Sequence, residues 1–147
     1  MKWFFVGLAL VLGMFLPVQA GINAELRRMV QEPVWAAFIS FAVGTVALLG
    51  LGLVLGLPAQ ALAASVQAPL WTWTGGFFGA FFVTASVVLA VKLGAASMSA
   101  YIIAGQLAAS LLLDHYGILG YAVREVSPLR LLGTALLFAG ALLVQKY

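Results

Sequence analysis

Long apolar runs, separated by short links that contain polar residues, Pro or Gly, dominate this chain. A membrane-spanning helix needs about 20 apolar residues, and five runs reach that length. They predict helices over residues 3–24, 34–57, 70–91, 94–113 and 128–145. No stretch shows the alternating ten-residue segments of a membrane β-barrel. The pattern therefore predicts an all-α integral membrane protein, with a single five-helix transmembrane domain over residues 1–147.

The links between these runs differ in polarity. Residues 25–33 (ELRRMVQEP) are charged, whereas residues 58–69 (PAQALAASVQAP) carry no charge and have a Pro at each end. The uncharged link suits either the membrane surface or a cap over a cavity. Lys92 marks a very tight turn, and residues 114–127 form the longest polar link.

The stretch GMFLPVQAGINAELRR, residues 13–28, can be interpreted in two ways. A basic start, an apolar run and the sequence V-Q-A ending at Ala20 resemble a secretory signal peptide and its cleavage site. Alternatively, the segment is a lasting membrane helix with Gln19 and Asn23 inside it. The apolar pattern continues without a break through Ala20, and we therefore expect this helix to be retained.

The composition strengthens the membrane assignment. Hydrophobic residues make up 65% of the 147 residues and charged residues only 7%, against about 25% charged in a soluble domain. Too few polar side chains exist to cover a surface that faces water. The chain has no cysteine, which excludes disulfides and thiolate metal sites. No basic cluster exists to bind nucleic acid.

The basic residues hardly favour one membrane orientation. With five spans the termini lie on opposite faces, and Lys and Arg near the spans set orientation. The two faces carry three and four basic residues, and a chain with so even a distribution of charge can insert in both orientations. Two copies in opposite orientations can form an antiparallel dimer, which is the two-chain form of an inverted repeat. A weak bias is equally compatible with one orientation. The N-terminal face carries Lys2, Arg124 and Arg130, and the other face carries Arg27, Arg28, Lys92 and Lys146.

Small residues recur every four positions in several spans, as in the series Ala96, Ala100, Ala104 and Ala108. Such stripes let helix backbones approach closely in lipid. They predict a tight bundle, and the last two spans offer flat faces on which a second subunit could pack.

Polar residues inside spans are costly and often functional. Gln19 and Asn23 are four residues apart and share one helix face. Gln106 lies mid-span on the fourth helix, and Tyr101 lies on another side of that helix. Each amide could contact a small polar solute or hydrogen-bond to a neighbouring helix, and the sequence leaves both roles open.

The third span opens with Trp71 and Trp73. Tryptophan at this depth is usually an interfacial anchor. The alternative is an aromatic wall of a cavity, to which the glycines that follow would give room.

The residue types that the spans lack also narrow the possible classes of function. No span has a carboxylate near its middle, because Glu25 and Asp114 lie only at helix ends. This disfavours simple exchange of a cation for a proton. No cluster of His, Asp or Glu suits a metal or haem, and no Ser/His/Asp set lies at one depth. We therefore expect neither a cofactor nor an enzyme.

Two charged residues border the last link. Asp114 ends the fourth helix and Arg130 begins the fifth, on the same face of the membrane, so we expect a structural ion pair that fixes this hairpin. The neighbouring His115, the single histidine, could instead sense pH.

The spans also carry short motifs in a fixed order. The motifs are Gln19-x-x-x-Asn23 with Leu26, Phe41-x-x-Gly44-Thr45, Trp71-x-Trp73-x-Gly75-Gly76-x-x-Gly79-Ala80, Gly105-Gln106-Leu107, Asp114-His115-x-Gly117, and Arg130-x-x-Gly133 with Gly140. In order and spacing they resemble the YdcZ-type family of small bacterial inner-membrane exporters, within the drug/metabolite transporter superfamily, and the resemblance covers nearly the whole chain.

The resemblance implies a five-helix half-transporter in the bacterial inner membrane. Members of the superfamily often act as antiparallel dimers or as fused ten-helix repeats. Related small multidrug exporters use a membrane Glu in the first helix, where this chain has Gln19 and Asn23. Cation specificity and proton coupling are therefore not carried over.

We expect a small secondary exporter of a polar or amphipathic metabolite, working by alternating access as an antiparallel homodimer or with a paralogous partner. The alternative is a non-transporting scaffold or accessory subunit of a larger complex. Substrate, coupling ion and direction do not follow from the sequence. The expected solute site lies near the dimer axis and contains Gln19, Asn23, Trp71, Trp73, Tyr101 and Gln106.

Overall fold

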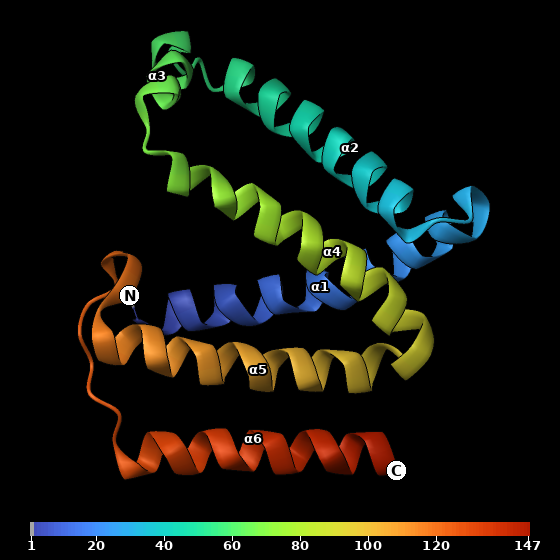
Figure 1. Ribbon diagram of the computed structural model, residues 1–147, viewed down its shortest axis with the longest axis vertical. Coiled ribbons are helices and arrows are strands. Elements are labelled where there is room, and N and C mark those ends of the chain that lie inside the picture. The colour runs from blue at the N-terminus through green and yellow to red at the C-terminus, as the bar shows by residue number, and fades with distance from the viewer. Residues whose placement is uncertain (1) are drawn as a thin grey trace. The chain divides into compact units, whose positions relative to one another are not determined.

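The computed structural model describes residues 2–147, which form helices and the turns that join them (Figure 1). Within these residues no strand occurs, and five helical segments are long and apolar enough to cross a membrane. The prediction of an all-helical protein with five spans is confirmed. The spans are α1 (Lys2–Val30), α2 (Pro33–Val54), Leu70–Leu93, which includes α4 (Thr74–Leu93), α5 (Ala95–Tyr116) and α6 (Pro128–Lys146).

The chain divides into two compact units. One unit is Val18–Val88, and the other combines the residues up to Pro17 with Leu89–Tyr147. The first boundary therefore falls inside α1, directly after Pro17. Proline has no N–H to donate to the preceding turn, so α1 lacks one backbone hydrogen bond at this boundary.

Helix α1 extends beyond its predicted end at residue 24 and continues through the charged residues to Val30. Arg28 donates to the Glu25 carboxylate over 3.1 Å, a pairing that the helical spacing of three residues favours. The helix ends where Gln31 adopts a left-handed φ of 62°. The longer helix places Gln19 well inside α1 rather than near its end.

In the Val18–Val88 unit, α2 and α4 form a hairpin. The uncharged link between them contains α3 (Ala59–Ala64) and the 3₁₀ turns η1 (Ser65–Gln67) and η2 (Leu70–Trp73). Figure 1 shows α3 at the tip of this hairpin. Small side chains dominate the buried positions of this unit. The buried residues of this unit are Ala20, Asn23, Ala36, Ala37, Val83, Ser86 and Val87.

In the other unit, α5 and α6 lie side by side and antiparallel (Figure 1). Helix α5 begins after Gly94, whose φ of 78° makes the tight turn from α4. Ala104 of α5 and Ala141 of α6 are almost fully buried, and residues of this size let the two backbones approach. The Tyr101 hydroxyl donates to Oε1 of Gln145 and joins the two helices.

Candidate solute-binding site

A recess of about 200 Å³ lies within the Val18–Val88 unit, between α1 and α2. We call it the α1–α2 recess. Its α2 residues follow the spacing i, i+1, i+4, i+5 and i+8, which places them on one helix face. They lie around the middle of α2, at the depth where transporters commonly bind solutes. The recess is lined by Gln19, Ser40, Phe41, Gly44, Thr45 and Leu48.

The recess combines hydrogen-bonding and apolar groups. Gln19 provides an amide, and Ser40 and Thr45 provide hydroxyls. The Thr45 hydroxyl donates to the Phe41 carbonyl over 2.8 Å, which leaves its oxygen lone pairs free to accept from a solute. The rings and methyl groups of Phe41 and Leu48 cover the remaining wall. No charged side chain lines the recess.

Asn23 lies one helical turn beyond Gln19 on the same stripe of α1. Its side chain is only 3% exposed, and its Nδ2 has no hydrogen-bond partner among residues 2–147. An unsatisfied buried donor costs about 1–3 kcal/mol. A polar group kept in a membrane helix at that cost is a functional-site candidate.

Trp71 and Trp73 belong to η2, directly before α4. Their side chains are exposed, and neither lines the α1–α2 recess. They stand at the end of the Leu70–Leu93 span, where tryptophan commonly occupies the membrane–water boundary.

Tyr101 and Gln106 lie on α5, outside the Val18–Val88 unit. Tyr101 is half-buried and its hydroxyl is engaged by Gln145, whereas Gln106 is exposed. Of the six residues expected to contact a solute, Gln19 alone lines the α1–α2 recess.

Ser40 and Thr45 had not been expected at a site. They are the only residues of α2 (Pro33–Val54) that carry a hydroxyl group, and the rest of this helix is largely apolar. Each hydroxyl alone is a weak signal, because Ser and Thr can hydrogen-bond back to their own helix. The available signal was the motif Phe41-x-x-Gly44-Thr45, because all three of its named residues line the recess.

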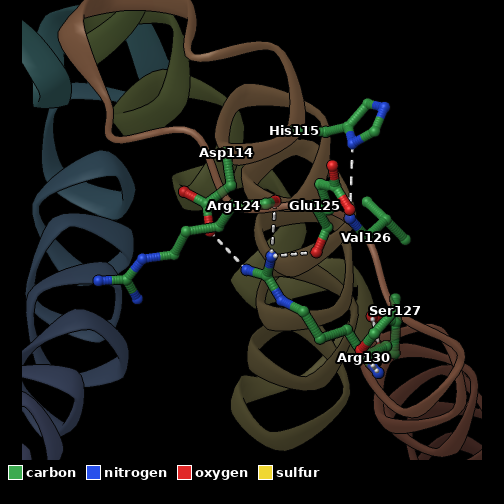
Figure 2. Close-up of polar contacts among 8 residues, drawn as sticks. Asp114, His115, Arg124, Glu125, Val126, Ser127 and Arg130 are labelled. Atoms are coloured by element: carbon green, nitrogen blue, oxygen red, sulfur yellow. Dashed lines mark hydrogen bonds and ion pairs between the residues drawn. The ribbon is translucent and has the colours of Figure 1, made fainter.

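Arg130 connects the start of α6 with the end of α5 and the link between them (Figure 2). Its Nη2 lies 2.5 Å from Oδ2 of Asp114. Its Nη1 donates to the carbonyls of Arg124 and Glu125 over 3.1 and 3.4 Å. Figure 2 shows the guanidinium between these groups. The cluster orders the hairpin at one end.

The same link is fixed by its backbone. The Arg124 amide donates to the Asp114 carbonyl over 2.8 Å, and the Val126 amide donates to Nδ1 of His115 over 3.4 Å (Figure 2). Gly117 ends α5 with a left-handed φ of 62°. His115 therefore accepts a backbone hydrogen bond in the link that Arg130 also holds.

Comparison with known proteins gives one finding. The family model described as "Putative inner membrane exporter, YdcZ" matches residues 4–143. No curated protein and no solved structure matches the chain significantly. The match includes the recess, its neighbour Asn23 and the Arg130 cluster. The chain therefore belongs to the YdcZ family of inner-membrane exporters and lies in the inner membrane with five apolar helices among its described residues.

Proposed function

We propose that this protein is a secondary exporter of a small polar or amphipathic metabolite. One observation carries the proposal: an uncharged recess with an amide and two hydroxyls lies halfway along a membrane span of a chain from an exporter family. A polar group at that depth is energetically costly unless it hydrogen-bonds to a solute or to a neighbouring helix.

The proposed working unit is a pair of chains in opposite orientations. Five spans place the two termini on opposite membrane faces, and four basic residues on one face stand against three on the other. Near balance permits both insertions. Two opposed copies, or one copy with a paralogous partner, reproduce the inverted repeat that supports alternating access.

The proposed transport path extends from the α1–α2 recess to polar and aromatic residues elsewhere in the pair. An amide such as Gln106 is costly against lipid, which supports a polar environment around it in the assembled pair. The residues proposed to line the path are Gln19, Asn23, Trp71, Trp73, Tyr101 and Gln106.

Metabolite profiling tests export by an untargeted comparison that covers many candidate solutes at once. Cells that express the wild type, Gln19→Leu or the control Val18→Leu are compared by mass spectrometry of medium and cytoplasm. Val18 is an exposed apolar neighbour on α1. We expect at least one small uncharged metabolite to rise in the medium and fall in the cytoplasm with the wild type and the control, but not with Gln19→Leu.

Identical profiles for the wild type, Gln19→Leu and cells without the protein would contradict export. Stable copurification with an unrelated membrane complex would then favour the scaffold alternative. Loss of export in both substituted proteins would indicate a defect in folding or insertion, which the amount of protein in the membrane measures directly.

A further inference from the structure

The α1–α2 recess is far from every fixed charge of its own unit. The charged residues within Val18–Val88 are Glu25, Arg27, Arg28 and Glu32, all at the junction of α1 and α2. Gln19 is separated from Glu25 by about 9 Å of helix rise, and Ser40 is separated from Glu32 by about 12 Å. The recess therefore offers a solute hydrogen bonds without a counter-charge.

We propose that the α1–α2 recess binds an uncharged solute whose hydrogen-bonding head joins a small apolar body. A charged solute would lose its hydration in the membrane interior and gain no opposite charge in return. A purely apolar solute would leave the Gln19 amide and the Ser40 hydroxyl without partners. A neutral amphipathic molecule avoids both costs.

The lining also defines the head group. The Gln19 amide both donates and accepts, and the Thr45 hydroxyl, which donates to the Phe41 carbonyl, is left to accept. A head that carries a donor and an acceptor on neighbouring atoms, such as a primary amide or a diol, satisfies this set. Phe41 and Leu48 then contact the apolar body.

The volume of the recess favours a small solute. A volume of about 200 Å³ corresponds to roughly seven water molecules at about 30 Å³ each. This suits a molecule with roughly seven to ten non-hydrogen atoms rather than a large drug.

The proposal rests on the proposed export function only in identifying this molecule with the exported solute, since binding itself is measured separately.

Single cysteines in this cysteine-free chain report occupancy of the recess. Ser40→Cys and Thr45→Cys are placed in it, and Val43→Cys and Val46→Cys serve as controls on the opposite, exposed side of α2. The purified full chain in liposomes is labelled with a water-soluble, membrane-impermeant thiol reagent. We expect labelling at the two recess positions and slow labelling at the two controls.

The probes are benzamide, benzoate and benzamidinium, which share one shape and carry charges of zero, minus one and plus one. We expect benzamide, at about four times its Kd for the Thr45→Cys variant, to slow labelling of that cysteine about fivefold. At the same concentration benzoate and benzamidinium leave the rate unchanged. The nearly isosteric Gln19→Met in the Thr45→Cys background, and separately Ser40→Ala, reduce the benzamide protection.

Several results would overturn the proposal. The first three are no labelling at the recess positions, no protection by benzamide, and equal protection by all three probes. The fourth is equal protection of the control Val46→Cys, because that result would indicate that the probe acts from the bilayer and not from the recess. Metabolite export without benzamide protection would leave the exporter assignment standing and refute this site. Protection by benzamide without any export would leave the site standing and refute the proposed function.

Discussion

The ring of Phe41 on α2 lies 3.4 Å from the point that a Cβ on Gly79 of α4 would occupy. The same ring lines the α1–α2 recess. We expect Gly79→Ala to leave the ring in place, because 3.4 Å is close to ordinary van der Waals contact. We expect the longer side chain of Gly79→Leu to displace the Phe41 ring and so to change the volume of the recess.

The labelling rate of Thr45→Cys measures this displacement. Gly75→Leu is the matched control, since nothing lies within 4 Å of a Cβ at Gly75. We expect Gly79→Leu to change the rate and Gly75→Leu to leave it near the parent value. Equal rates in both variants would show that Gly79 does not control the position of Phe41.

Neutralisation of Asp114 is predicted to lower the stability of the protein, because it breaks the ion pair with Arg130. The two side chains are 23% and 33% exposed, so water screens the attraction only in part. We expect Asp114→Asn to lower the free energy of unfolding by about 1–2 kcal/mol, measured by thermal or denaturant unfolding in detergent. Glu25→Gln breaks the more exposed pair with Arg28 and should cost less than about 0.5 kcal/mol. Equal losses would contradict this ranking.

Gly117 is predicted to tolerate no side chain. Its φ of 62° is left-handed, and a Cβ there would lie 2.7 Å from Cγ2 of Val123. We expect Gly117→Ala to destabilise the protein by about 1–3 kcal/mol in the same unfolding measurement. Val123→Ala added to it should relieve the overlap but not the backbone strain. Gly133→Ala is the control, because its Cβ meets nothing within 4 Å, and stability equal to that of Gly117→Ala would refute this explanation.

Gln106→Ala is predicted to abolish export while the protein remains folded. Gln106 is exposed on α5, so removal of its amide empties no packed core. The metabolite profile gives the activity, and the unfolding midpoint gives the stability. Leu112→Ala, another exposed position of α5, serves as the control. Unchanged export by a folded Gln106→Ala protein would remove this residue from the path.

Membrane orientation is predicted to be mixed. Single cysteines at the two termini, labelled from outside intact cells, should each react in about half of the molecules if the chain inserts both ways. Lys2→Gln leaves two basic residues on the N-terminal face against four on the other. It should therefore move the N-terminus outward, whereas Arg27→Gln with Arg28→Gln should move it inward. Reaction at only one terminus of the parent would exclude an antiparallel homodimer and direct attention to a partner of opposite orientation.

The sequence by itself determined the class and the family of this protein. Apolar runs of bilayer length fix five spans, because a backbone in lipid must satisfy its hydrogen bonds within a helix. The order of the motifs predicted the YdcZ family, which the match over residues 4–143 confirms. Membership and five apolar helices also confirm the inner membrane as the location.

The tertiary structure decided which polar groups share a space. Sequence spacing places Gln19 and Asn23 on one face of α1, but it does not state which face of α2 meets them. In the structure Gln19 lies at a recess with Ser40 and Thr45, whereas Asn23 is buried with an unpaired Nδ2. Helix packing depends on small differences in side-chain volume across two surfaces, and a one-dimensional pattern of apolar residues does not contain that information.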